Sequence, residues 1–278
     1  MSLFDALCHT FGTVATGGFS TQNSSIAGFS PYIQYVIIVF MFLAGTNFTL
    51  HYFLLHGQFK KVWQNEEYRY YIYLIVVAGA IVTGVLIAID NDPFEKAFRD
   101  ALFQVVSIIT TTGYITDDYL LWPNMLWIII VLLMFVGGMA GSTGGGIKVI
   151  RQLLLFKNSS LELKRLIHPQ AIIPVRLSGK AVSQDIIFKV MAFFLLYIII
   201  FSFGTLIMSF MGLDFETALG SAAATLGNIG PGIGKVGPVG NYAAIPMGGK
   251  WFLSFLMLLG RLELFTVLIL MTAAFWKK

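Results

Sequence analysis

The sequence predicts an all-α membrane protein made of repeated helix–pore loop–helix units around a central pore. Its residues are 57% hydrophobic and only 12% charged, whereas a soluble domain carries about 25% charged residues. Five stretches are long and apolar enough to span a bilayer. Between them lie three shorter helical stretches, each followed by a segment rich in glycine, threonine or asparagine.

The spanning helices are expected at about residues 31–55, 70–89, 123–151, 186–211 and 251–275. Glycines interrupt the third of them. The shorter helices are expected at residues 3–13, 94–109 and 215–225, and each is too short to cross a membrane. Irregular backbone at membrane depth is tolerated only where protein or a water-filled cavity shields it. We therefore expect each short helix and the segment after it to form a re-entrant pore loop.

The placement of charge predicts the topology. Basic residues gather in residues 56–69, in residues 148–189 and at the C-terminus, whereas acidic residues predominate around the pore loops. By the positive-inside rule the basic linkers face the cytoplasm and the pore-loop entrances face outside. The net charge of +4 therefore reflects membrane topology, and no nucleic-acid partner is expected. The single cysteine, Cys8, excludes an internal disulfide and a cysteine-based metal site.

Three segments of the sequence align with one another. "DALCHTFGTVATGGFST" begins at Asp5, "DALFQVVSIITTTGYIT" at Asp100 and "TALGSAAATLGNIGPGI" at Thr217. An internal repeat outranks local propensity in the interpretation of a sequence. It divides the chain into a partial repeat (1–56), a complete repeat with a glycine-interrupted inner helix (57–155), a basic cytoplasmic linker (156–185) and another complete repeat (186–278).

Each aligned segment contains a candidate ion-binding loop. Potassium-channel filters are built from T-V-G-Y-G loops whose backbone carbonyls replace the hydration shell of the ion. The "TTGY" sequence is a near match, "TGGF" is more distant and "NIGP" is the most distant. Small residues that only permit close helix packing are the alternative, but three aligned copies favour a cation pathway. The predicted potassium filter residues are Thr16, Gly17, Gly18, Thr111, Thr112, Gly113, Asn228, Ile229 and Gly230.

The segment "GGMAGSTGGGIK" interrupts the third spanning stretch. So many glycines disfavour a continuous helix, and the segment lacks the G-K-[ST] ending and preceding strand of a phosphate-binding loop. It is either a flexible barrier below the filter or a loose kink. An arginine within the last span is a functional hypothesis by default; it is expected to meet carbonyls of the glycine segment or pore water, with an ion pair as the alternative. The candidate gating residues are Gly138, Gly141, Gly144, Gly145, Gly146 and Arg261.

Five motifs carry a resemblance to a known family: "TVATGGFST", "ITTTGY", "GGMAGSTGGGIKVIR", "TLGNIGPG" and "GRLELFTVLIL". With them the chain resembles the Trk/Ktr/HKT superfamily of potassium transporters, and its Trk branch most. The resemblance implies a fold of four repeats of the potassium-channel type around one pore. This chain supplies three filter loops and lacks the first repeat, so it is expected to be truncated.

The resemblance also implies potassium uptake across the cytoplasmic (inner) membrane, with a loop at residues 137–146 obstructing the pore. Potassium is then the transported ion, with no other cofactor. The implied partners are membrane lipid, a second copy in a homodimer and a cytosolic nucleotide-binding regulatory subunit (TrkA-like), for which the basic linker and C-terminus are the docking surface. Two alternatives stay open: a sodium-coupled or sodium-permeable transporter, and a non-conducting fragment. An enzyme is not expected, because no carboxylate pair, catalytic triad or metal cluster lies at membrane depth.

Overall fold

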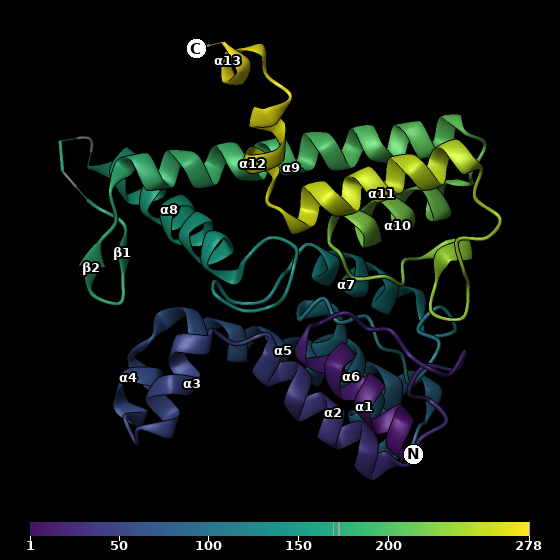
Figure 1. Ribbon diagram of the computed structural model, residues 1–278. Helices are drawn as coiled ribbons and strands as arrows, with labels where there is room; N and C mark the ends of the chain where they lie inside the picture. Colours follow the sequence, from purple (N-terminus) through teal and green to yellow (C-terminus); the bar gives the residue numbers. More distant parts are fainter. Residues whose placement is uncertain (169, 172, 278) are drawn as a thin grey trace.

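The computed structural model describes residues 1–168, 170–171 and 173–277, and its regular structure is almost entirely α-helical. Pro169 and Ile172 of the predicted linker, and Lys278 of the basic C-terminus, lie outside the described residues. Figure 1 shows two layers: one is formed by the first part of the chain around α1, α2 and α5, the other by α9, α10 and α11. The segment between α7 and α8 passes between these layers.

The three predicted short helices are present as α1 (Leu3–Val14), α6 (Phe94–Ile109) and α10 (Phe215–Leu226). Side chains fix where two of them begin. The Ser2 hydroxyl accepts a hydrogen bond from the amide of Asp5 at 3.1 Å, and the Asp214 carboxylate accepts one from the amide of Thr217 at 3.2 Å. Each bond satisfies an amide that has no partner within the first turn of its helix.

Within the part of the chain that the structure describes, two helices are long and apolar enough to cross a membrane unaided: α5 (Glu66–Asp90) and α9 (Gln184–Phe210). They correspond to the stretches predicted at residues 70–89 and 186–211. Helix α5 packs against α6, and α9 packs against α10. Each spanning helix thus supports the short helix that follows it in the chain.

Two predicted spans are not single straight helices. Helices α2 (Pro31–Ala44) and α3 (Phe48–Leu55) meet at 105°, and α11 (Met247–Arg261) meets α12 (Leu264–Leu270) at 117°. The prediction of continuous spans over residues 31–55 and 251–275 was therefore wrong. Asn47 begins a new helix by accepting a hydrogen bond from the amide of Thr49 at 2.8 Å. At the second break Glu263 has a φ of 65°, which no α-helix accommodates.

The third predicted span is interrupted at its glycines. Helix α7 (Asn124–Met134) ends before them and α8 (Val149–Ile167) begins after them. Helix α8 extends well beyond residue 151, so it occupies the first part of the predicted linker. The rest of that linker holds an antiparallel pair of short strands, β1 (Arg176–Leu177) and β2 (Lys180–Ala181). The remaining elements are α4 (Phe59–Gln64), the 3₁₀-helix η1 (Gly234–Val236) and α13 (Ala273–Trp276).

The buried core has two main parts. One joins α2, α5, α6 and α7, and its fully buried members include Met41, Val82, Phe103 and Leu126. The other joins α9, α10 and α11, with Tyr197, Ala218 and Leu256 among its members. Because both parts enclose a short helix, α6 in one and α10 in the other, the loops that follow these helices are held by packed structure.

Candidate functional site

The three loops after α1, α6 and α10 share one backbone conformation. In each loop two residues, separated by one other, have positive φ angles between 51° and 106°. The amide of the residue between them returns a hydrogen bond to its own short helix, at 2.8 to 2.9 Å. Alternating backbone of this kind turns successive carbonyls toward the same side of the chain, as carbonyl-lined ion sites require. The positive-φ residues are Thr16 and Gly18, Thr111 and Gly113, and Asn228 and Gly230.

The loops lie against one another in chain order. A Cβ atom placed on Gly18 would be 1.8 Å from the carbonyl oxygen of Thr112, and one placed on Gly113 would be 1.9 Å from that of Ile229. Such distances are impossible for real side chains, so both positions require glycine. At Gly230 no atom of the described residues would lie within 4 Å of such a carbon. The predicted filter segments are therefore brought together as consecutive neighbours, loop one beside loop two and loop two beside loop three.

Three tyrosine hydroxyls donate hydrogen bonds to backbone carbonyls in or next to these loops. Tyr114 donates to the carbonyl of Phe19 at 3.2 Å. Tyr119 donates to Gly232 at 2.6 Å, and Tyr242 donates to Gly230 at 2.7 Å. Burial raises the pKa of the Tyr119 and Tyr242 hydroxyls, so both remain protonated donors at neutral pH.

The glycine segment, residues 135–148, contacts all three loops; we call it the gate loop. Its Gly145 amide donates to the Thr111 hydroxyl at 2.6 Å. Its Thr143 carbonyl accepts a hydrogen bond from the Thr16 hydroxyl at 3.0 Å. A Cβ atom on Gly145 would lie 3.0 Å from the Cβ of Asn228. The gate loop therefore touches the first positive-φ residue of every filter segment.

Arg261 contacts the gate loop, as the sequence predicted. Its guanidinium donates to the carbonyl of Thr143 at 2.7 Å. The predicted position within a continuous span was wrong, because Arg261 is the last residue of α11, at the break before α12. Glu263 does not pair with it but forms an ion pair with Arg151. Arg261 therefore reaches the gate loop from the break between α11 and α12.

Further side chains bind the gate loop at Ala140 and Gly144, and sequence reasoning missed them. Asn47 at the α2–α3 bend donates to the carbonyl of Ala140 at 2.6 Å. The amide of Ala140 donates to Glu67, which is 5% exposed, at 2.7 Å. Lys148 donates to the carbonyl of Gly144. A charged residue just before the span predicted at residues 70–89 was the signal for Glu67; Tyr119, Tyr242 and Asn47 gave none.

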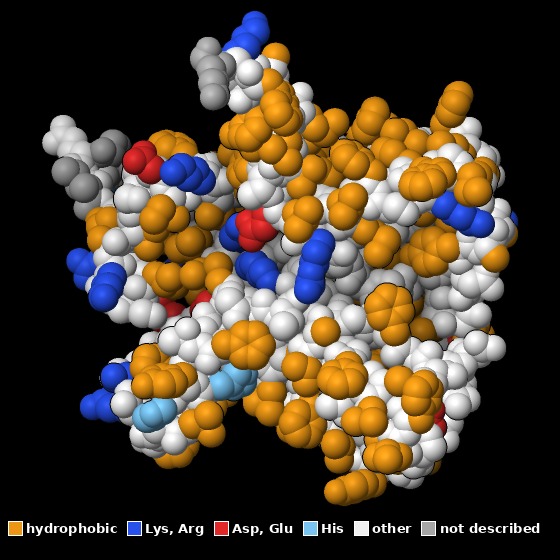
Figure 2. Space-filling view, in the orientation of Figure 1, with side chains coloured by type: hydrophobic (Ala, Val, Ile, Leu, Met, Phe, Trp, Pro, Cys, Tyr) orange, Lys and Arg blue, Asp and Glu red, His pale blue; other side chains and the backbone are white. Residues whose placement is uncertain are grey.

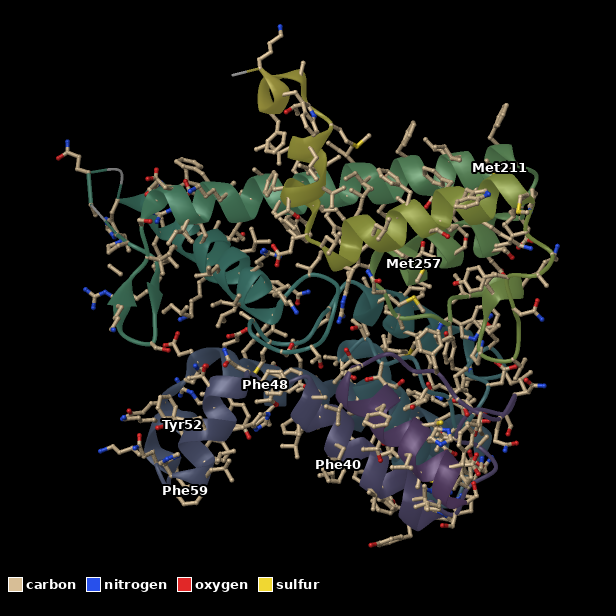
Figure 3. The ribbon with its side chains drawn as sticks, in the orientation of Figure 1. Phe40, Phe48, Tyr52, Phe59, Met211 and Met257 are labelled. Atoms are coloured by element: carbon tan, nitrogen blue, oxygen red, sulfur yellow. The ribbon has the colours of Figure 1, made fainter. Side chains whose placement is uncertain are left out.

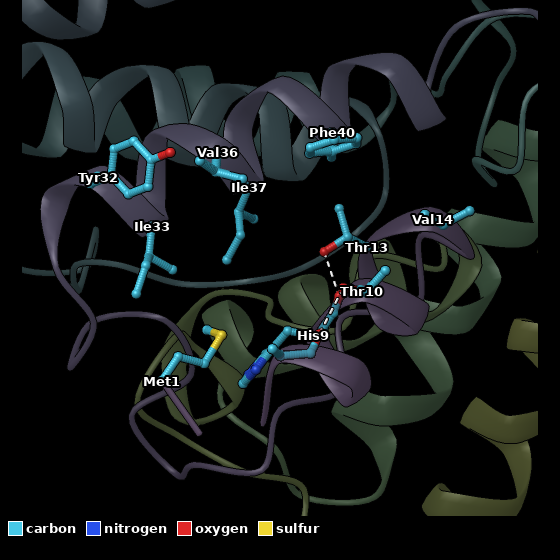
Figure 4. A pocket seen from close by; sticks show the side chains of 11 residues that line it. Met1, His9, Thr10, Thr13, Val14, Tyr32, Ile33, Val36, Ile37 and Phe40 are labelled. Carbon is cyan, nitrogen blue, oxygen red and sulfur yellow. Dashed lines mark hydrogen bonds between the residues drawn. The ribbon is translucent and has the colours of Figure 1, made fainter. Parts of the chain in front are cut away.

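Several cavities lie near these elements. One of about 230 Å³ is bounded by the gate loop, Arg151, Arg261 and Glu263, and it is polar. Another, of about 370 Å³, lies between α1 and α2 and is mostly apolar. Figure 4 shows it lined by Ile37, Phe40 and neighbours, with Thr13 bonded to His9 of its own helix. The polar cavity adjoins four of the predicted gating residues, Gly144, Gly145, Gly146 and Arg261.

Comparison with known proteins gives the following matches. The family described as TrkH, cation transport protein, matches residues 1–278. The chain is 42% identical over 281 residues to the Trk system potassium uptake protein TrkH of Salmonella typhimurium. It is 42% identical over 283 residues to the protein of that name from Escherichia coli. Each alignment covers 100% of this chain and 58% of the relative, so the chain spans about 58% of the length of these relatives.

Among solved structures, the potassium transporter TrkH from Vibrio parahaemolyticus matches with a TM-score of 0.94 and 40% identity. The match covers 100% of this chain and 60% of that chain.

Proposed function

The chain belongs to the TrkH family of cation transport proteins, and on that premise we propose that it forms three sides of a potassium-uptake pore in the cytoplasmic membrane. The observation that carries this proposal is the shared backbone of the three loops, each pressed against the next at a glycine. Carbonyls of residues 16–18, 111–113 and 228–230 would replace the hydration shell of the ion. Potassium is then cargo, and the chain performs no enzymatic step.

The short helices contribute to cation binding. Helices α1, α6 and α10 each end two residues before a filter segment. The C-terminal end of a helix carries a partial negative charge. Three such ends directed at one place favour a cation there over an anion. Residues 1–56, 57–155 and 186–278 are accordingly proposed as the repeats that surround the pore.

The gate loop is proposed to close the pore beneath the filter. Its contacts with Thr16, Thr111 and Asn228 support this proposal, because backbone there would obstruct an ion leaving the filter. Arg261 would add a fixed positive charge there, which raises the barrier to a cation. Opening requires the hydrogen bonds to Arg261, Asn47 and Glu67 to break or move. Its glycines lower the cost of that rearrangement.

The proposed topology places the basic linkers in the cytoplasm and the pore-loop entrances outside. The linker 156–185 and the C-terminus would receive a cytosolic nucleotide-binding regulatory subunit, and the working assembly would be a homodimer.

One observation favours a second candidate, a pore that also passes sodium. The carbonyl of Gly230 accepts a hydrogen bond from Tyr242, and Pro231 follows where the other loops have an aromatic residue. The third loop would therefore offer a weaker set of ligands than the other two.

Substitution of Gly113 by serine tests the filter. The new Cβ would collide with the Ile229 carbonyl at 1.9 Å and displace it. Rubidium uptake is measured in vesicles that contain the intact protein, with potassium or sodium as the competing ion. We expect the preference for potassium over sodium to fall about tenfold or more, which corresponds to ~1.4 kcal/mol. Gly179→Ser is the matched control, because Gly179 has the same φ of 81° as Gly113 and nothing within 4 Å. Equal selectivity in the two variants would reject the filter assignment.

A further inference from the structure

The α3–α4 region, residues 48–64, forms an arm at one end of the molecule, beside the N-terminal end of α5 (Figure 1). We propose that this arm lies on the membrane surface and binds the headgroups of anionic phospholipids. The inference concerns a lipid site and does not depend on which cation the pore prefers.

The direction of the arm is the first argument. Helix α3 leaves α2 at 105°, so it runs nearly at right angles to a helix that contributes to a span. If α2 lies along the bilayer normal, α3 runs close to the plane of the bilayer, where aromatic side chains concentrate at the membrane–water interface. The Asn47 cap fixes this change of direction at one residue.

The apolar side chains of the arm are the second argument. On α3 the exposed residues recur every three or four positions, which puts them on one face, and α4 repeats the pattern. Opposite them Leu50 and Val62 are 3% and 2% exposed and belong to the core. Figure 3 shows Phe48, Tyr52 and Phe59 on this arm. Aromatic residues of this kind concentrate at membrane–water interfaces. The exposed apolar face consists of Phe48, Tyr52, Leu55, Phe59 and Trp63.

The charge of the arm is the third argument, and it selects the lipid. Lys60 and Lys61 are exposed, and neither forms an ion pair within the part of the chain that the structure describes. The Lys61 ammonium lies 5.0 Å from the centre of the Phe53 ring. The nearest acidic residues in the chain are occupied: Glu66 pairs with Lys157, and Glu67 binds the gate loop. Figure 2 shows the basic and histidine side chains among hydrophobic ones over this region.

Unpaired lysines beside an interfacial aromatic face match a surface of anionic headgroups, whose negative potential attracts basic side chains. A protein partner would instead cover the aromatic face and keep lipid from it. The two occupants therefore differ in whether acyl chains reach Trp63.

Lipid-borne quenching of Trp63 fluorescence tests the proposal. The intact protein, purified in its native assembly, is placed in nanodiscs of phosphatidylglycerol and phosphatidylcholine, with bromine on the acyl chains of one lipid at a time. The Trp63 signal is the difference between the parent protein and Trp63→Phe. We expect brominated phosphatidylglycerol to be preferred about fivefold or more over brominated phosphatidylcholine.

Lys60→Gln/Lys61→Gln should reduce that preference to near unity while Trp63 remains quenched by both lipids. Arg176→Gln/Lys180→Gln, which removes two cations from the β1–β2 hairpin instead, should leave the preference intact. Three results would overturn the proposal: no quenching by either lipid, equal quenching by both in the parent protein, or an unchanged preference in the arm variant. The first of these would indicate that protein covers the arm.

Discussion

Replacement of Arg261 by alanine removes one of the bonds that hold the gate loop in place. The guanidinium donates to the Thr143 carbonyl at 2.7 Å, and a hydrogen bond to a charged group contributes about 1.5–3 kcal/mol. Its loss should raise the ratio of open to closed gate loop by roughly 10- to 100-fold, since about 1.4 kcal/mol is a factor of ten. Removal of the positive charge also lowers the barrier to a cation below the filter. Both effects increase flux.

The assay is rubidium uptake into vesicles that contain the intact protein in equal amounts. Arg261→Ala should take up rubidium at least several times faster than the parent protein, with its potassium-over-sodium preference preserved, because the filter loops are unchanged. Arg165→Ala is the matched control: Arg165 also donates to a carbonyl, that of Ile173, at 2.7 Å, but lies in the linker region. If folded Arg261→Ala conducts no faster than this control, the gate loop is a static kink and the gating argument fails.

Two further predictions concern the tyrosines that support the loops and the topology. Tyr119→Phe leaves the Gly232 carbonyl without its 2.6 Å partner, so it should lower the free energy of unfolding by about 1–3 kcal/mol and weaken ion selectivity. Tyr197→Phe is the control, because Tyr197 is buried and its hydroxyl makes no hydrogen bond to the described residues, so neither property should change. Thermal unfolding and competition uptake measure the two effects, and indistinguishable variants would refute a supporting role for Tyr119. A cysteine at Asp118 should react with membrane-impermeant thiol reagents from outside, and a cysteine at Lys164 only from within; the reverse labelling would overturn the proposed topology.

Local sequence signals were sufficient to locate the short helices. The prediction of a helix at residues 94–109 coincides with α6 (Phe94–Ile109), because a proline precedes it and a threonine run follows it. The repeat alignment also located the positive-φ glycine of each filter loop, Gly18, Gly113 and Gly230, since the same backbone needs the same residue at the same offset. These features depend on short-range chemistry that recurs along the chain.

The breaks between α2 and α3 and between α11 and α12, and the side chains that bond to the loops, could not be predicted, because they depend on contacts between residues distant in the sequence. An apolar run shows that a segment is buried in lipid or protein but does not show its direction, so the 105° and 117° breaks were missed. The bond from Tyr119 to Gly232 joins residues 113 positions apart, and neither residue has a distinctive neighbour. The contact of Arg261 with the gate loop was predicted from the cost of an intramembrane charge, but its place at the end of α11 required the structure.

Anomalous scattering from thallium or rubidium ions in crystals of the intact protein would show whether the three loops bind a permeating cation. We expect anomalous peaks on the axis bounded by the carbonyls of residues 16–18, 111–113 and 228–230, with none beyond the gate loop. These peaks should weaken when sodium replaces the heavier ion. Ions found elsewhere in the protein, with no peak between these loops, would contradict the claim.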